Sequence, residues 1–150
     1  MNWVFDDGGR AEAGYKGRTG DCVCRAIAIA TERPYQEVYD LINETAKRER
    51  TGKRKKKVSS ARTGVFSGTE RRVMQHYGWT WHPTMHIGSG CTVHLREDEL
   101  PAGRLVVSVS RHTVAVIDGV VHDTHDCTRG GTRCVYGYYT KEGNDADRAV

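Results

Sequence analysis

The sequence lacks several features that mark common protein classes. No run of 18 or more apolar residues occurs, which argues against a membrane-spanning helix. The opening segment, M-N-W-V-F-D-D-G-G, has neither the basic start nor the apolar stretch of a signal peptide. There is no C-x-x-C pair, no G-x-x-x-x-G-K-[ST] phosphate loop and no internal repeat. We therefore expect a cytoplasmic protein without a membrane partner, whose five cysteines stay reduced.

The net charge of +4 is concentrated in one segment. Residues 47–57 hold eight Lys or Arg and one Glu, whereas the rest of the chain holds 15 basic and 18 acidic residues. Such a patch is typical either of a solvated loop or of a binding site for nucleic acid or another polyanion. No aromatic residue is interleaved to provide a stacking surface. The candidate polyanion-binding residues are Lys53, Arg54, Lys55, Lys56 and Lys57.

Hydrophobic spacing predicts helices in the first half of the chain. Residues 22–31 are apolar nearly all round, which indicates a short buried helix. Residues 35–46 carry apolar side chains three and four positions apart, as in an amphipathic helix. A third helix is predicted from Ser67 to Tyr77, because Ser67 and Glu70 have the spacing of a capping box.

The second half of the chain reads as strands, and its 150 residues suit a single domain. Helices followed by antiparallel strands indicate an α+β fold. Asp118-Gly119 is a hairpin signal between two of the strands. The predicted strands are 79–81, 105–109, 113–117, 120–123 and 134–139, and the irregular parts are a leader at 1–13, the basic loop at 47–66 and a frayed tail at 141–150.

The segment T-G-D-C-V-C-R, residues 19–25, places a thiol at the start of the first predicted helix. Free N–H groups of a first turn favour a thiolate and can bind a developing oxyanion. Thr19 or Asp21 is expected to cap this helix. Cys24 lies about 200 degrees further round and should face the core. Cys22 is thus a candidate nucleophile, although the local sequence alone favours a buried structural cysteine.

The predicted hairpin supplies groups that would activate such a thiol. With a two-residue loop, position 117 pairs with 120, 115 with 122 and 114 with 123. Asp123 then returns close to His112, whereas His122 points to the opposite face. A carboxylate in that place can accept a hydrogen bond from the imidazole and fix its orientation.

Together these segments resemble a known family. A D-C pair opening a buried helix, then H-T-V-A-V-I-D-G on one strand and V-H-D on the next, is similar to papain-like cysteine peptidases, above all the compact bacterial branch with the bacteriocin-leader peptidases. The segments G-D-C, R-A-I-A-I-A-T, I-G-S-G-C and H-D-T also resemble a group of small bacteriophage proteins, over about residues 14–139. A phage origin would place the protein in the host cytoplasm.

The resemblance implies a helical half with the nucleophile, an antiparallel sheet half with the base, and a cleft between them. In it Cys22 would be the nucleophile, His112 the general base and acid, and Asp123 the orienting acid. The family carries a Gln about six residues before the cysteine to build the oxyanion hole, and a C-G-S-C-W signature. Here Lys16 occupies the Gln position and residues 1–21 contain no Gln.

Lys16, Thr19 or a backbone N–H would therefore have to donate to the oxyanion, with Asp21 next to the thiol. Loss of one such donor can cost about 100-fold in rate. A weak peptidase, or a transferase or amidase with the same three residues, also fits the pattern.

Two other segments carry reactive side chains. Residues 122–134 gather His122, His125, Cys127 and Cys134, but their spacing is poor for zinc, so we expect neither a metal nor a cofactor. Residues 85–95 form a glycine-broken loop. This loop either lines a cleft with Ser89 or Cys91 or simply turns between core elements.

Three hypotheses follow. The first is a papain-like cysteine hydrolase, a peptidase or isopeptidase with a polypeptide substrate. The second is the same fold with a weak or inactive site, binding nucleic acid or an acidic partner through residues 47–57. The third is a zinc-stabilised interaction module.

Overall fold

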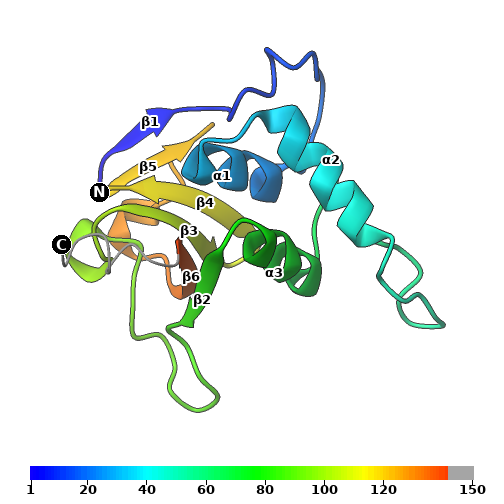
Figure 1. The fold of residues 1–150 in the computed structure, drawn as a ribbon. Coiled ribbons are helices and arrows are strands. Elements are labelled where there is room, and N and C mark those ends of the chain that lie inside the picture. The colour runs from blue at the N-terminus through cyan, green and yellow to red at the C-terminus, as the bar shows by residue number, and fades with distance from the viewer. Residues whose placement is uncertain (142–150) are drawn as a thin grey trace.

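The computed structural model of the chain describes residues 1–141 and has an α+β fold (Figure 1). Within this range three α-helices accompany one six-stranded sheet. No helix of this range is long and apolar enough to cross a membrane. The helices are α1 (Cys22–Thr31), α2 (Tyr35–Ala46) and α3 (Ser67–His76), and the strands are β1 (Trp3–Phe5), β2 (Trp79–Pro83), β3 (Arg104–Val109), β4 (His112–Ile117), β5 (Val120–Asp123) and β6 (Val135–Lys141).

The sheet has the order β1-β5-β4-β3-β6-β2, and its pairings are antiparallel except for β1 with β5. The β4–β5 hairpin turns at Asp118-Gly119, with Ile117 opposite Val120 and Ala115 opposite His122. Asp118 and Gly119 both have positive φ, as a two-residue hairpin loop requires. The predicted strands, turn and α+β class are therefore confirmed.

Helices cover one face of the sheet, and loops cover the other. On β3, Val106 points toward the helices, where it shares a core with Cys24 and Ile27 of α1. The neighbouring Leu105 and Val107 point to the opposite face and pack with residues of the 95–100 segment. Eight of the ten residues of α1 are buried, as its all-round apolar character predicted.

Two sequence predictions about local structure are wrong. The 1–13 leader is not wholly irregular, because β1 pairs in parallel with β5 and Asp6 N–H donates to the Asp123 carbonyl at 2.9 Å. Three residues are too few to show a period, so this strand is defined by its partner. The capping box is also absent from the described residues: Ser67 is already helical, and the Glu70 side chain is buried toward Thr113 instead of turning back.

The prediction that all cysteines stay reduced is wrong for two of them. Cys91 and Cys134 form a disulfide with a Cα–Cα separation of 5.8 Å, while Cys22, Cys24 and Cys127 are free. The glycine-broken loop after β2 brings Cys91 back to the start of β6, which the sequence spacing did not indicate. Of the predicted frayed tail, Lys141 ends β6 and residues 142–150 lie outside the described range.

Candidate active site

The candidate site lies where three elements begin or end. Cys22 is the first residue of α1, His112 is the first of β4, and Asp123 is the last of β5. His112 Nε2 lies 2.6 Å from Asp123 Oδ2, so the hairpin register brings these two side chains together as predicted. Helix α1, which Cys22 begins, packs on β4, and the Cys22 thiol is one of the groups that raise the pKa of His112. The structure therefore brings the three predicted residues together.

The contacts of His112 decide its protonation state. Burial alone would lower the pKa of His112, but the hydrogen bond to Asp123, together with those to the Cys127 and Cys22 thiols, raises it to about 11. The imidazolium is therefore the form present near neutral pH. Because Nε2 is engaged by Asp123, Nδ1 is the ring nitrogen left for a thiol.

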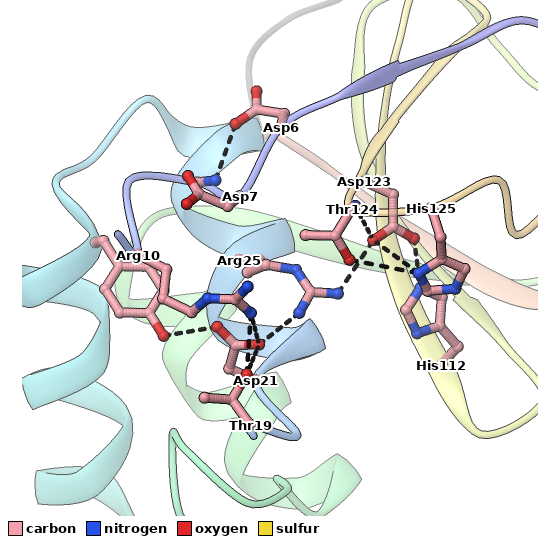
Figure 2. A network of polar contacts seen from close by, with 12 residues as sticks. Asp6, Asp7, Arg10, Thr19, Asp21, Arg25, His112, Asp123, Thr124 and His125 are labelled. Carbon is pink, nitrogen blue, oxygen red and sulfur yellow. Dashed lines mark hydrogen bonds and ion pairs between the residues drawn. The ribbon is translucent and has the colours of Figure 1, made fainter. Parts of the chain in front are cut away.

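Asp123 is a buried carboxylate with donors on both oxygens. Its Oδ2 accepts from His112, and its Oδ1 accepts from the Thr124 backbone N–H at 2.7 Å and from Arg25 Nη2 at 3.1 Å (Figure 2). Burial would raise the pKa of Asp123, yet these donors, His112 first, lower it to about 2. The carboxylate is thus held ionised and in one orientation.

Arg25 connects this carboxylate to a second buried acid, Asp21 (Figure 2). Asp21 precedes α1, and its side chain is fully buried. Besides Arg25 Nη1, it accepts from Tyr35 Oη at 2.7 Å, Thr19 Oγ1 at 2.9 Å and Arg10 Nη1 at 3.1 Å. Burial would raise the pKa of Asp21, but these partners hold it below its usual value. The network fixes the start of α1 to the end of β5.

The predicted oxyanion and first-turn residues have different surroundings from those expected. Neither Thr19 nor Asp21 caps α1 through its side chain, since among residues 1–141 no side-chain cap is found at this helix. Thr19 instead donates to Asp21, and Asp21 as an ionised acid has no proton to donate. Lys16 is exposed, and its backbone carbonyl accepts from Arg62. The remaining donors are the backbone N–H groups of the first turn.

The prediction that Cys24 faces the core is confirmed. Its thiol is fully buried, and it lies 3.9 Å from the Tyr35 carbonyl. Burial and the nearby Asp21 raise the pKa of the Cys24 thiol to about 12. Cys24 is therefore a small core residue, unlike Cys22, which is partly exposed at the helix start.

Sequence reasoning missed three residues of the site. Arg25 is the charged residue in an otherwise apolar helix, and its spacing of four from Asp21 was the signal available. Cys127 is buried and reaches His112 from the chain after β5. The His125 ring lies 5.2 Å from the His112 ring. The last two lie in a loop, where sequence spacing carries no geometric information.

The four residues considered for zinc do not converge on one point. His122 lies 3.5 Å from Asp6, and Cys134 is in the disulfide. A different group, His112, Asp123 and His125, has ligand atoms within 4.8 Å of one another. Its donors are already occupied by the His112–Asp123 hydrogen bond, and the Arg25 guanidinium beside it repels a cation. This group is better explained as an ion pair than as a metal site.

The basic loop projects from the body of the molecule after α2 (Figure 1). Lys53, Arg54, Lys56 and Lys57 are exposed, whereas Lys55 Nζ lies 3.1 Å from Glu49 and 4.5 Å above the Phe66 ring. Phe66 is 48% exposed, so an aromatic face that is distant in sequence lies beside the basic residues. Residues 47–57 themselves contain no aromatic side chain, so their sequence indicated no stacking surface.

A thiol, an imidazolium and an ionised carboxylate thus meet at one end of the sheet, tied to α1 by a buried arginine. This is the arrangement that a functional assignment has to explain. The chain matches no protein-family model, no curated protein and no solved structure.

Proposed function

We propose that the protein is a papain-like cysteine hydrolase that acts on a peptide or isopeptide bond through Cys22, His112 and Asp123. The observation that carries this proposal is the 2.6 Å hydrogen bond between His112 and Asp123, on an imidazole whose pKa the Cys22 thiol helps to raise. Apart from β1, the helices precede the strands, and α1 packs on β4; this agrees with the helical and sheet halves that the family resemblance implies. Thiol, imidazole and carboxylate are the three groups that nucleophilic catalysis by cysteine needs.

In this mechanism the Cys22 proton resides on His112 as the imidazolium, and the Cys22 thiolate attacks the carbonyl carbon of the substrate. The C–N bond then breaks, and the imidazolium gives its proton to the leaving amine, which leaves a thioester on Cys22. Water, deprotonated by His112, hydrolyses the thioester and regenerates the thiol. Asp123 stays ionised throughout and fixes the ring, because its second oxygen is held by Arg25 and Thr124.

The oxyanion formed in both steps needs donors close to the sulfur. The first-turn N–H groups of α1 lack intrahelical acceptors by geometry, and no side chain among the described residues caps them. They point along the helix axis toward the end where Cys22 lies, and the helix dipole favours negative charge there. We therefore assign the oxyanion hole to backbone groups of α1, in place of the Gln of the family.

Alkylation kinetics test the proposal without knowledge of the substrate. With the disulfide intact, Cys22, Cys24 and Cys127 are the free thiols, and iodoacetamide at about pH 6 should modify Cys22 far faster than the two buried ones. Peptide mapping by mass spectrometry gives each rate. His112→Gln should slow the Cys22 reaction, whereas His122→Gln, a change on the same hairpin facing Asp6, should not. Equal slow modification of all three thiols would remove the enzymatic proposal.

Hydrolysis itself is tested with a complex peptide library. Cleavage sites are read by mass spectrometry, with the Cys22→Ser protein as the blank. Products that appear with the wild-type chain and are absent with Cys22→Ser support a peptidase. Fast alkylation of Cys22 without any cleavage would instead favour a transferase or amidase with the same three residues.

A second candidate function is binding of nucleic acid or another polyanion by the loop at residues 47–57. The observation that favours it is the exposed Phe66 ring beside Lys55, in a loop that carries four further exposed cations, since stacking and charge together are the usual means of binding single strands. Affinity for single-stranded DNA should fall linearly in log salt, and Lys53→Ser with Lys57→Ser should reduce that slope by about 1–2. An affinity for single-stranded DNA that does not change with salt concentration would exclude this function.

A further inference from the structure

Away from the candidate active site, a cluster of soft metal ligands lies where the loop after β2 meets β6. Cys91 Sγ lies 3.6 Å from His94 Nε2, and Cys91 is bonded to Cys134. The spacing Cys91-Thr92-Val93-His94 is a C-x-x-H pair, a short form that zinc sites use. We propose that Cys91, His94 and Cys134 bind one zinc ion when the disulfide is reduced, so that the disulfide and the metal are alternative cross-links at the same place.

The distances fit a tetrahedral zinc ion. With Zn–S near 2.3 Å and Zn–N near 2.0–2.1 Å, a tetrahedral angle separates the sulfur and nitrogen ligands by about 3.6 Å. The Cys91 Sγ to His94 Nε2 distance of 3.6 Å already has this value. After reduction the two sulfurs must separate to about 3.8 Å for the same geometry, and a Cα–Cα separation of 5.8 Å allows this by side-chain rotation.

His94 is oriented as a metal-binding histidine. Its Nδ1 and its backbone N–H both lie 3.2 Å from Glu99 Oε1, and its Nε2 lies beside Cys91 Sγ. A carboxylate on the second ring nitrogen is the common outer partner of a zinc-bound histidine, because it fixes the ring and raises its basicity.

The backbone around the cluster is held in place independently of the disulfide. His94 and Cys134 form an isolated antiparallel bridge, with Leu95 N–H donating to the Arg133 carbonyl and Val135 N–H to the Val93 carbonyl, both at 2.8 Å. The loop that follows β2 projects from the body of the molecule (Figure 1). Reduction should therefore leave the ligands near one another.

The exchange of the disulfide for a zinc ion takes place in two steps, reduction and metal binding. A phosphine reduces the disulfide, taking oxygen from water to become the phosphine oxide and leaving two thiols. Zinc then binds, and the thiols release two protons to solvent as their sulfurs become thiolate ligands. Cys91 is exposed, so water can fill the fourth position that three protein ligands leave.

The experiment loads the full chain with zinc in both redox states. The protein is reduced anaerobically with tris(carboxyethyl)phosphine, given Zn²⁺ alone, freed of excess metal by gel filtration and analysed by atomic emission. We expect one zinc per reduced chain, none per oxidised chain, and two of five thiols protected from a disulfide reagent until a chelator is added. Co²⁺ in place of zinc should give a thiolate-to-cobalt charge-transfer band and the visible bands of a tetrahedral ion.

Matched variants identify the ligands. His94→Ala keeps both cysteines and should lose the metal, as should Cys91→Ser and Cys134→Ser; Glu99→Gln should weaken binding by about 10–100-fold. His125→Ala, Cys127→Ser and Cys22→Ser should bind as wild type. If the Cys variants fail to fold, the oxidised and reduced wild-type chains and His94→Ala still decide the question.

Absence of zinc from the reduced chain would overturn the proposal. So would metal that persists in His94→Ala, or metal that is lost in His125→Ala, because the latter would place it on the candidate active site. None of these readouts depends on hydrolysis, so the proposed function can fail while this inference holds, and the reverse.

Discussion

Replacing Arg25 by Met tests whether the buried network holds the candidate active site together. Arg25 is 6% exposed, and its guanidinium contacts Asp21 through Nη1 and Asp123 through Nη2. Met preserves most of the aliphatic packing while removing both contacts. The change therefore isolates the electrostatic bridge between α1 and β5 from the packing of α1 on the sheet.

The loss of stability in Arg25→Met depends on the hydrogen-bond donors that Asp21 and Asp123 keep. Without Arg25, Asp21 keeps the donors on Arg10, Thr19 and Tyr35, and Asp123 keeps His112 and the Thr124 N–H. Removing one partner of a buried ion pair costs about 3–5 kcal/mol, and the surviving donors favour the lower end. For a chain of this size about 3 kcal/mol corresponds to a fall of about 6–12 °C in melting temperature.

The pH dependence gives a second readout. The pKa of Asp123 is lowered to about 2 in the folded chain, so the stability it contributes is present above its unfolded pKa of about 3.8 and lost as the pH falls through about 2. Removing the Arg25 charge raises the folded pKa of Asp123 toward the unfolded value. The variant should therefore lose less stability than wild type on acidification, starting from a lower value.

Thermal unfolding by circular dichroism between about pH 3 and pH 7 measures both effects. Arg25→Lys should fall between wild type and Arg25→Met, since one ammonium cannot reproduce the guanidinium fork. Arg33→Met is the matched control, because Arg33 is exposed and lies 3.9 Å from Glu37, where a surface pair contributes at most about 1 kcal/mol. If Arg25→Met and the Arg33→Met control had the same melting temperature, the reasoning would be refuted.

Three further changes test other parts of the structure. Burial raises the pKa of Glu70 to about 7, so its contribution to stability is present below about pH 4.5 and is lost as the pH rises through about 7; Glu70→Gln should raise the melting temperature at pH 8 and flatten this dependence. Gly137→Ala puts a Cβ 2.8 Å from the His82 carbonyl oxygen and against the Trp81 ring, so it should lower the free energy of unfolding, measured with denaturant, by about 1–3 kcal/mol. Gly68→Ala in α3 is the control, because open space surrounds that position and the change should not destabilise the fold. Asp123→Asn removes the charge that keeps His112 protonated. Alkylation of Cys22 near pH 6 should therefore slow about tenfold for each unit by which the pKa of His112 falls below that pH. An unchanged alkylation rate would show that Asp123 does not influence the thiol.

The parts of the site that sequence predicted are those set by local periodicity. The apolar run at residues 22–31 gave the bounds of α1, and with them the place of Cys22 at a helix start. The Asp118-Gly119 turn gave the register of the β4–β5 hairpin, and a register determines which side chains meet at its open end. His112 and Asp123 were found together for that reason.

The parts that sequence could not predict depend on pairing between distant segments. Arg25 and Asp123 are 98 residues apart, and nothing in either segment specifies that the end of β5 lies beside α1. The parallel strand β1 exists because β5 offers an unpaired edge, which three exposed residues cannot reveal. Glu70 fitted a local capping pattern, but burial against Thr113 determined its position.

The charges of the network explain why a thiol suits the position of Cys22. Arg10, Arg25 and the His112 imidazolium carry three positive charges, and Asp21 and Asp123 carry two negative ones, which leaves a net charge of +1. An unbalanced charge is costly in a mostly buried cluster, and a single anion beside His112 would neutralise it. In the proposed mechanism the negative charge, first on the Cys22 sulfur and then on the substrate oxygen, is that anion. In the proposed mechanism the two carboxylates therefore have different roles: Asp123 orients the ring, whereas Asp21 compensates the arginine charges and keeps the network one anion short of neutrality.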